Sequence, residues 1–181
     1  LPAYSLGARP QGGNPVKTLI PGARVTELLE NPGGELEYNG ERLRLPDIRL
    51  IYWAGGNPYH HHQDLHRLRQ AWQRPDTVIV NESVWTATAR HADIVFPCTT
   101  MLERNDIGGS SADCYVSPMR RVRAPYAQSR NDFDIFAALA KRLGVEQAFT
   151  EGRDEMQWLQ HLYALTRDSA AKTNVTLPGF E

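Results

Sequence analysis

The sequence predicts an α/β fold with a doubly wound, mainly parallel sheet and flanking helices. Three short apolar segments, at 48–54, 76–82 and 93–97, alternate with segments whose apolar residues recur at helical spacing. Such alternation is typical of parallel sheets, because each crossover between parallel strands places a helix against the sheet. A chain of 181 residues, 41% of them hydrophobic, is long enough for one such domain with extensions.

We expect a single domain over residues 47–172, an irregular N-terminal extension over 1–46 and a short tail over 173–181. The first 21 residues are rich in Gly and Pro and predict a loop. The chain starts without a Met inside this turn-rich stretch, which indicates a piece of a longer protein. A short helix over 22–31 and a hairpin over 35–45, with Asn39-Gly40 at its turn, complete the extension.

The sheet domain begins with "IRLIYWA" at 48–54, a continuous apolar strand of the kind that is covered on both faces of a parallel sheet. The elements predicted after it are a helix over 63–74, a second buried strand over 76–82, a short helix over 84–92 and a third strand over 93–97. Residues 98–131 look mostly irregular, with a possible strand or two near "CYVSPMRRV" at 114–122. Two amphipathic helices follow, over 132–144 and 154–172.

Composition excludes several function classes. A net charge of -1 and a pI of about 6.7 give no basic field, so we expect neither nucleic acid nor a membrane surface as a partner. Cys98 and Cys114 form no CxxC pair, which argues against a zinc ribbon and a disulfide framework. No segment approaches the roughly 20 apolar residues of a membrane span.

Ligands of an open parallel sheet bind beyond the carboxyl ends of its strands, and three polar loops follow the predicted strands there. Gly55 and Gly56 permit close backbone approach, and a helix starting near residue 63 would offer N–H groups to a phosphate. A tight strand-to-helix turn needs glycine as well, so both interpretations stand. The loop also carries His60, His61 and His62. Adjacent side chains in a loop point in alternate directions, so we predict no metal site and expect one histidine to contact a ligand.

The other two loops carry further candidates. Asn81 and Glu82 end the second strand, where they either cap the next helix or bind the hydroxyls of a sugar. Arg104, within "ERND", either reaches a phosphate or base or belongs to a structural cluster of salt bridges. Asp132 and Asp134 begin a helix, where an acid suits the positive helix end; one carboxylate could instead accept two hydrogen bonds from guanine.

No catalytic residue is predicted. Cys98 has no paired histidine apparent in the sequence, and Ser110 and Ser111 lack the pattern of a nucleophile elbow.

Taken together, "YWAGGNPYHHHQDL", "WTATARHADIVFP", "TTMLERNDIGG" and "RNDFDIFAALAKRLG" resemble the dimethyl sulfoxide reductase family of molybdenum enzymes. The similarity is greatest to the branch that reduces biotin sulfoxide and trimethylamine N-oxide, and it covers most of residues 45–165. Such enzymes have four domains around a molybdenum that is carried by two molybdopterin guanine dinucleotides. The chain resembles their third domain, which is Rossmann-like and grips mainly one dinucleotide.

The resemblance implies a role for each matching residue. Asn57 and His61 would contact the cofactor, with Gly55 and Gly56 allowing its approach. Asn81 and Glu82 would lie near the ribose, Arg104 would reach the phosphate or pterin, and Asp132 would bind guanine. Many relatives have His where this chain has Asn81, and Cys98 replaces a small residue. Residues 110–124 follow the family pattern poorly, so nothing is carried over to them.

The resemblance also implies that a longer parent enzyme removes an oxygen atom from an S-oxide or N-oxide. The serine that binds molybdenum in this branch belongs to an earlier domain, so the isolated chain is expected to lack activity and cofactor. Expected partners are the remaining domains and an electron donor, in the bacterial cytoplasm or periplasm, with the cytoplasm favoured. Two alternatives are a free-standing nucleotide-binding or regulatory module and a hydrolase that uses the histidine loop and a metal.

Overall fold

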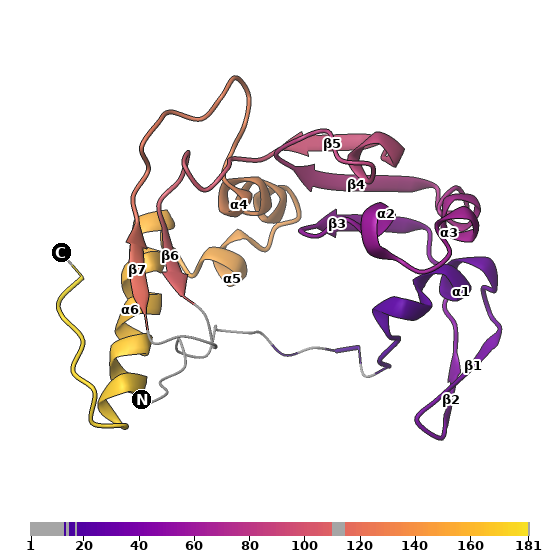
Figure 1. The fold of residues 1–181 in the computed structure, drawn as a ribbon, viewed down its shortest axis with the longest axis horizontal. Helices are drawn as coiled ribbons and strands as arrows, with labels where there is room; N and C mark the ends of the chain where they lie inside the picture. The colour runs from indigo at the N-terminus through magenta and orange to yellow at the C-terminus, as the bar shows by residue number, and fades with distance from the viewer. Residues whose placement is uncertain (1–12, 14, 17, 110–114, 181) are drawn as a thin grey trace. The chain divides into compact units, whose positions relative to one another are not determined.

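A computed structural model describes residues 13, 15, 16, 18–109 and 115–180 (Figure 1). The α/β class is confirmed, because a parallel sheet is flanked by helices. The described part of the chain divides into two compact units: residues 13–97, here called the sheet unit, and the residues from Cys98 onwards, here called the C-terminal unit. The division falls inside the segment 47–172, and the domain boundaries predicted from the sequence remain a prediction.

The start of the sheet unit matches the prediction. A 3-10 helix η1 (Gly22–Arg24) continues into α1 (Val25–Glu30). Strands β1 (Glu35–Tyr38) and β2 (Glu41–Arg44) form the expected antiparallel hairpin. Asn39 and Gly40 take φ values of 50° and 79° at its turn, the left-handed backbone that an Asn-Gly pair adopts readily.

The sheet has three parallel strands in the order β3-β4-β5, namely β3 (Leu50–Ala54), β4 (Thr77–Glu82) and β5 (Ile94–Pro97). All three strands were predicted. Between β3 and β4 the chain forms α2 (Pro58–His61) and α3 (Leu65–Ala71). The predicted helix over 63–74 is therefore confirmed, although it is shorter than expected, whereas α2 was not predicted.

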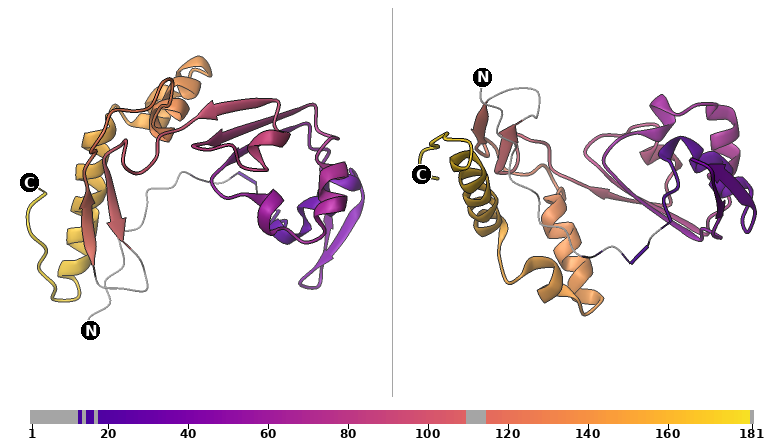
Figure 2. Two further views of the ribbon diagram at one scale, coloured as in Figure 1. Left: turned by 45° about the horizontal axis from the view of Figure 1, so that its top comes forward. Right: turned by 90° about the horizontal axis from the view of Figure 1, so that it is seen from below.

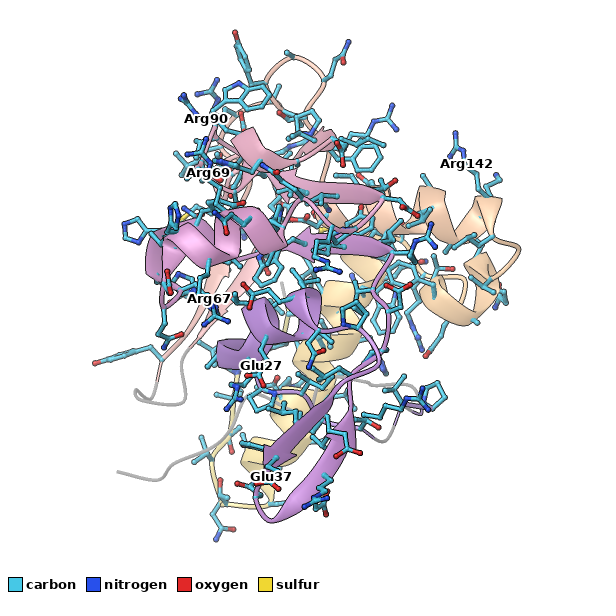
Figure 3. The ribbon with its side chains drawn as sticks, turned by 90° about the vertical axis from the view of Figure 1, so that its right-hand side faces the viewer. Glu27, Glu37, Arg67, Arg69, Arg90 and Arg142 are labelled. Atoms are coloured by element: carbon cyan, nitrogen blue, oxygen red, sulfur yellow. The ribbon has the colours of Figure 1, made fainter. Side chains whose placement is uncertain are left out.

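The core of the sheet unit lies on one face of the sheet. Ile51 pairs with Val78 in the strand register, and their neighbours two residues on share that face. Leu68 and Trp72 pack against them from the region of α3, and Tyr59 packs from α2. An ion pair between Arg67 of α3 and Glu30 joins α1 to α3 (Figure 3).

Several apolar residues on the opposite sheet face are exposed. Leu50 is 54% exposed, and Ile94 and Phe96 are also exposed. The prediction that residues 48–54 are covered on both faces is therefore wrong for Leu50. The physical reason is that successive residues of a strand point to opposite faces of the sheet. The helices pack on the face that carries Ile51, and Leu50 points to the other face.

The connection between β4 and β5 also differs from the prediction. A helix was expected over 84–92, but only η2 (Ala89–His91) forms, as a single 3-10 turn. The hydroxyl of Thr86 bonds to Glu82 and accepts from the Ala89 N–H, and Thr88 bonds to Asn57. Threonine side chains that bond in this way offer the backbone an alternative to a helix.

The C-terminal unit contains a hairpin and three helices. Its elements are β6 (Asp106–Gly109), β7 (Val116–Met119), α4 (Asp132–Arg142), α5 (Glu146–Thr150) and α6 (Glu155–Ala171). The possible strand near 114–122 and both long helices are confirmed, whereas β6 and α5 were not predicted. Figure 2 shows the β6-β7 hairpin beside α6, which begins at a capping box of Asp154 and Gln157.

Within the described residues, no helix is both long enough and apolar enough to cross a membrane.

Candidate functional site

The carboxyl edge of the sheet collects most of the candidate residues of the sheet unit. The strand register aligns Ala54 with Asn81, and Asn81 with Phe96. The loop that begins at Gly55 therefore starts beside Asn81 and Glu82. The sequence-based expectation that the loops after the parallel strands meet at one edge is met for these two loops.

Two glycines give this edge its shape. Gly55 and Gly56 have φ values of 80° and 75°, which side chains rarely adopt. A Cβ atom added to Gly55 would meet nothing within 4 Å, and one added to Gly56 would lie 3.9 Å from Trp53 Nε1. The indole Nε1 of Trp53 is buried and has no hydrogen-bond partner within the described part of the chain. The backbone at this edge is therefore open, and the approach of a dinucleotide over the two glycines remains a prediction.

Asn57 connects the loops that follow β3 and β4. Its Oδ1 atom accepts hydrogen bonds from the backbone N–H of Thr88, at 3.3 Å, and from the Thr88 hydroxyl. The Thr88 hydroxyl oxygen in turn accepts from the Tyr59 N–H, also at 3.3 Å. Asn57 therefore holds the β4–β5 connection in place. This role was not visible in the sequence, and its predicted cofactor contact remains a prediction.

The three histidines occupy different environments. His60 and His61 are exposed at the end of α2, whereas His62 is partly buried. The Nε2 atom of His62 lies 3.0 Å from the Thr26 hydroxyl, and burial, with His61 nearby, lowers the pKa of His62. Among the residues that the structure describes, no group of three or more His, Cys, Asp or Glu side chains could hold a metal ion. The cofactor contact assigned to His61 remains a prediction.

The helix start predicted near residue 63 is capped by a side chain of the chain itself. Helix α3 begins at Leu65, and its N-cap is Asp64, whose carboxylate accepts a hydrogen bond from the Arg67 N–H at 3.2 Å. Because that carboxylate is negatively charged and satisfies one of the amides, it disfavours a phosphate at this helix start. The phosphate contact that the sequence suggested for this helix start remains a prediction.

Asn81 and Glu82 project from the end of β4. Asn81 is buried, and its Oδ1 atom accepts from the Tyr52 hydroxyl at 2.9 Å. Glu82 accepts from the Ser83 N–H at 2.9 Å and from the Thr86 hydroxyl at 3.2 Å. Glu82 therefore braces the following loop and does not cap a helix. The ribose role predicted for both residues remains a prediction.

Arg104 belongs to the C-terminal unit. Its Nε atom donates to Asp106 at 3.1 Å, and one terminal nitrogen donates to the Thr99 carbonyl at 2.8 Å. The neighbouring Glu103 is buried and accepts from the Thr100 N–H at 3.0 Å and from the Tyr126 N–H at 3.1 Å. These hydrogen bonds lower the pKa of Glu103. They agree with the structural interpretation of "ERND", while the phosphate or pterin contact of Arg104 remains a prediction.

Asp132 occupies the first position of α4. The N-cap of this helix is Asn131, whose side-chain oxygen accepts from the Phe133 N–H at 3.3 Å. Asn131 therefore supplies the cap, and Asp132 and Asp134 lie in the first turn. The guanine contact predicted for Asp132 stays a prediction.

A groove of about 660 Å³ lies in the C-terminal unit, and the sequence did not indicate it. It is lined by the β6-β7 hairpin, by Met156 and Tyr163 of α6, and by residues 178–180. None of the predicted cofactor-binding residues lines it. Ser110 and Ser111, which the sequence analysis rejected as nucleophiles, and Cys114 lie outside the described residues. Cys98 is half-buried.

Comparison with known proteins adds an independent finding. A sequence profile described as molybdopterin oxidoreductase matches residues 6–142. The chain is 49% identical to a biotin sulfoxide reductase of Cereibacter sphaeroides, over 98% of this chain and 24% of that protein. It is 51% identical to a dimethyl sulfoxide/trimethylamine N-oxide reductase of Cereibacter sphaeroides, over 91% of this chain and 20% of that protein. It is 46% identical to a trimethylamine-N-oxide reductase of Haemophilus influenzae, over 99% of this chain and 22% of that protein.

The chain thus spans about a quarter of the length of the curated relatives it matches, or less. Among solved structures, acetylene hydratase from Pelobacter acetylenicus has a similar fold, with a TM-score of 0.58 over 72% of this chain and 18% of that chain. At 16% identity, this likeness concerns the fold alone.

Proposed function

The chain belongs to the molybdopterin oxidoreductase family, and we propose that it is a fragment of a longer molybdenum-dependent enzyme that reduces S-oxides or N-oxides. The observation that carries the proposal is the identity of 46–51% to reductases of S-oxides and N-oxides across nearly the whole chain. The bound molybdenum cofactor supplies the two-electron redox chemistry of such an enzyme.

The role of this chain in the enzyme is to bind one molybdopterin guanine dinucleotide. Gly55 and Gly56 leave room for the dinucleotide beside the backbone, and the Glu82 carboxylate and Asn81 supply acceptors for ribose hydroxyls. Asn57 fixes the loop that carries Glu82's hydrogen-bond partner Thr86. His61, which is exposed on the same loop as the glycines, provides a further contact.

Two residues of the C-terminal unit complete the proposed contacts. Arg104 reaches a phosphate or the pterin, with Asp106 and Thr99 holding its guanidinium in place. Asp132 selects guanine, because a carboxylate accepts two hydrogen bonds from N1–H and N2–H₂, a donor pair that adenine lacks. Asp132 lies in the first turn of α4, whose cap is Asn131.

The experiment that tests this role is a calorimetric titration of the purified chain with GDP and with ADP. We expect GDP to bind more tightly, and Asp132→Ala to remove the preference. Asp134→Ala is the matched control, since it removes an acid from the same first turn of α4 and has a similar effect on the helix dipole. A preference for GDP that persists in Asp132→Ala would contradict the guanine assignment.

The isolated chain is proposed to be inactive, because the serine ligand of molybdenum in this branch belongs to another domain. A turnover assay with a reduced dye and dimethyl sulfoxide should give no more reduction than buffer does. Measurable turnover by the purified chain would refute this part of the proposal. Partners are proposed to be the rest of the enzyme and its electron donor, in the bacterial cytoplasm or periplasm.

A further inference from the structure

Trp85 is the feature of the sheet unit that the fold does not explain. Its side chain is 69% exposed, although tryptophan is among the residues that gain most from burial. Within the part of the chain that the structure describes, no aromatic ring contacts it. Removing the indole would therefore leave no cavity in the fold.

The loop that carries Trp85 is held firmly. Glu82 bonds to the Ser83 N–H and to the Thr86 hydroxyl, and the Thr86 hydroxyl accepts from the Ala89 N–H at 3.2 Å. The Nε atom of Arg90 donates to the Trp85 carbonyl at 3.2 Å, and Figure 3 shows Arg90 and Arg69 on the same side of the sheet unit. A braced backbone presents the indole in a limited range of positions, which lowers the entropy lost on binding.

The same bonds place Trp85 at the carboxyl edge of the sheet. It follows Glu82 by three residues, a span of at most about 10 Å. On its other side, Thr88 is bonded to Asn57 at the end of the glycine loop. The loop is thus fastened at both ends to residues that the proposed function assigns to the dinucleotide.

We infer that the Trp85 indole stacks on the purine base of the nucleotide bound at this sheet edge, an inference that rests on the proposed function. The base is joined directly to the ribose that Glu82 is proposed to hold, so an indole within three residues of Glu82 is in reach. Every purine has a π-face, so stacking of this kind contributes affinity without discriminating between bases. Trp85 is therefore a binding residue whose contribution is separable from that of a base-selective carboxylate.

The test combines fluorescence and calorimetry on the whole chain, with GDP and ADP as probes. Addition of GDP should quench tryptophan fluorescence in the unmodified chain, and Trp85→Phe should abolish most of the quenching while keeping a stacking ring. Trp158→Phe, in α6 of the C-terminal unit, is the matched control and should leave the quenching intact. Trp85→Ala should raise the dissociation constants of GDP and ADP by about tenfold each.

The outcomes separate this inference from the proposed function. If GDP binds but Trp85→Ala leaves its affinity unchanged, or Trp85→Phe leaves the quenching intact, the inference is overturned and dinucleotide binding stands. In that case another part of the parent enzyme covers the indole. If GDP at millimolar concentration gives neither heat nor quenching with the folded chain, the dinucleotide-binding role fails and the inference fails with it. Circular dichroism of each variant verifies folding.

Discussion

Thr88 donates two hydrogen bonds to one atom of Asn57, its Oδ1, from the backbone N–H at 3.3 Å and from the hydroxyl. This pair joins the loop after β3 to the loop after β4, and Thr88 is fully buried. A buried donor that loses its acceptor carries its full desolvation cost, so Asn57 contributes to stability as well as to the proposed site.

Replacing Asn57 tests that double role. Asn57→Ala leaves the Thr88 N–H without its acceptor, and we expect the free energy of unfolding to fall by about 1–3 kcal/mol in urea denaturation. Asn57→Asp keeps an acceptor at the same position, so its free energy of unfolding should fall by less. Equal stability of the alanine and aspartate variants would contradict the structural role of this pair.

Gly55 provides a test of backbone approach. Gly55→Ala places a side chain at a φ of 80°, which costs about 1–2 kcal/mol of stability, and it also fills the open space at the sheet edge. Gly40→Ala is the matched control, because Gly40 has a φ of 79° and likewise nothing within 4 Å of an added Cβ. The melting temperatures of both variants should fall by similar amounts, whereas only Gly55→Ala should weaken GDP binding. Similar GDP affinity in the two variants would argue against approach over Gly55.

His62 predicts a pH dependence of stability. Its pKa is lowered in the folded chain, chiefly by burial, so the unfolded chain takes up a proton first as the pH falls. Its contribution to stability is present above the unfolded pKa of about 6.5 and is lost as the pH falls through the folded pKa. The melting temperature should therefore decrease less between pH 7 and 5 in His62→Gln than in the parent. His60→Gln, at an exposed position of α2, should behave like the parent.

Glu103 predicts a second transition at lower pH. Hydrogen bonds, first of all from the Thr100 N–H, lower its pKa. Its contribution is therefore present above the unfolded pKa of about 4.3 and is lost as the pH falls through the folded pKa. Glu103→Gln should reduce the urea midpoint at pH 7, because an amide NH₂ replaces one of its acceptor oxygens. The difference in urea midpoint between Glu103→Gln and the parent should be smaller at pH 3.5 than at pH 7. An equal difference at both pH values would show that the charge of Glu103 does not contribute to stability.

The elements that the sequence predicted well are those with long periodic or continuous apolar patterns. Strands β3 and β4, and helices α4 and α6, have such patterns, and their type depends little on the rest of the chain. Helix α2 escaped prediction because it has four residues, begins with a proline and has no apolar period. Strand β6 has two glycines among its four residues, and its pairing with β7 outweighs their weak preference for strands.

The candidate site was predictable in its parts but not in its connections. Topology brings the glycine loop and Asn81 to one edge, and the order of strands along the sequence was sufficient to anticipate this. The bond between Asn57 and Thr88 joins residues that are 31 positions apart, and no local pattern indicates it. The capping of α3 by Asp64 likewise depends on a left-handed backbone at a non-glycine residue, with a φ of 48°.

The strand order β3-β4-β5 has a consequence for the lifetime of a bound nucleotide. Open α/β sheets form their ligand crevice where the strand order reverses, and the described strands of the sheet unit run in one direction without a reversal. Within the sheet unit, a nucleotide at this edge meets strand ends without a second wall, so its retention depends on contacts from outside the sheet unit. With a dissociation constant on the order of 0.1 mM and association at about 10⁶–10⁷ M⁻¹s⁻¹, it would stay bound for a few milliseconds. Magnetic resonance titrations would then be in intermediate to fast exchange.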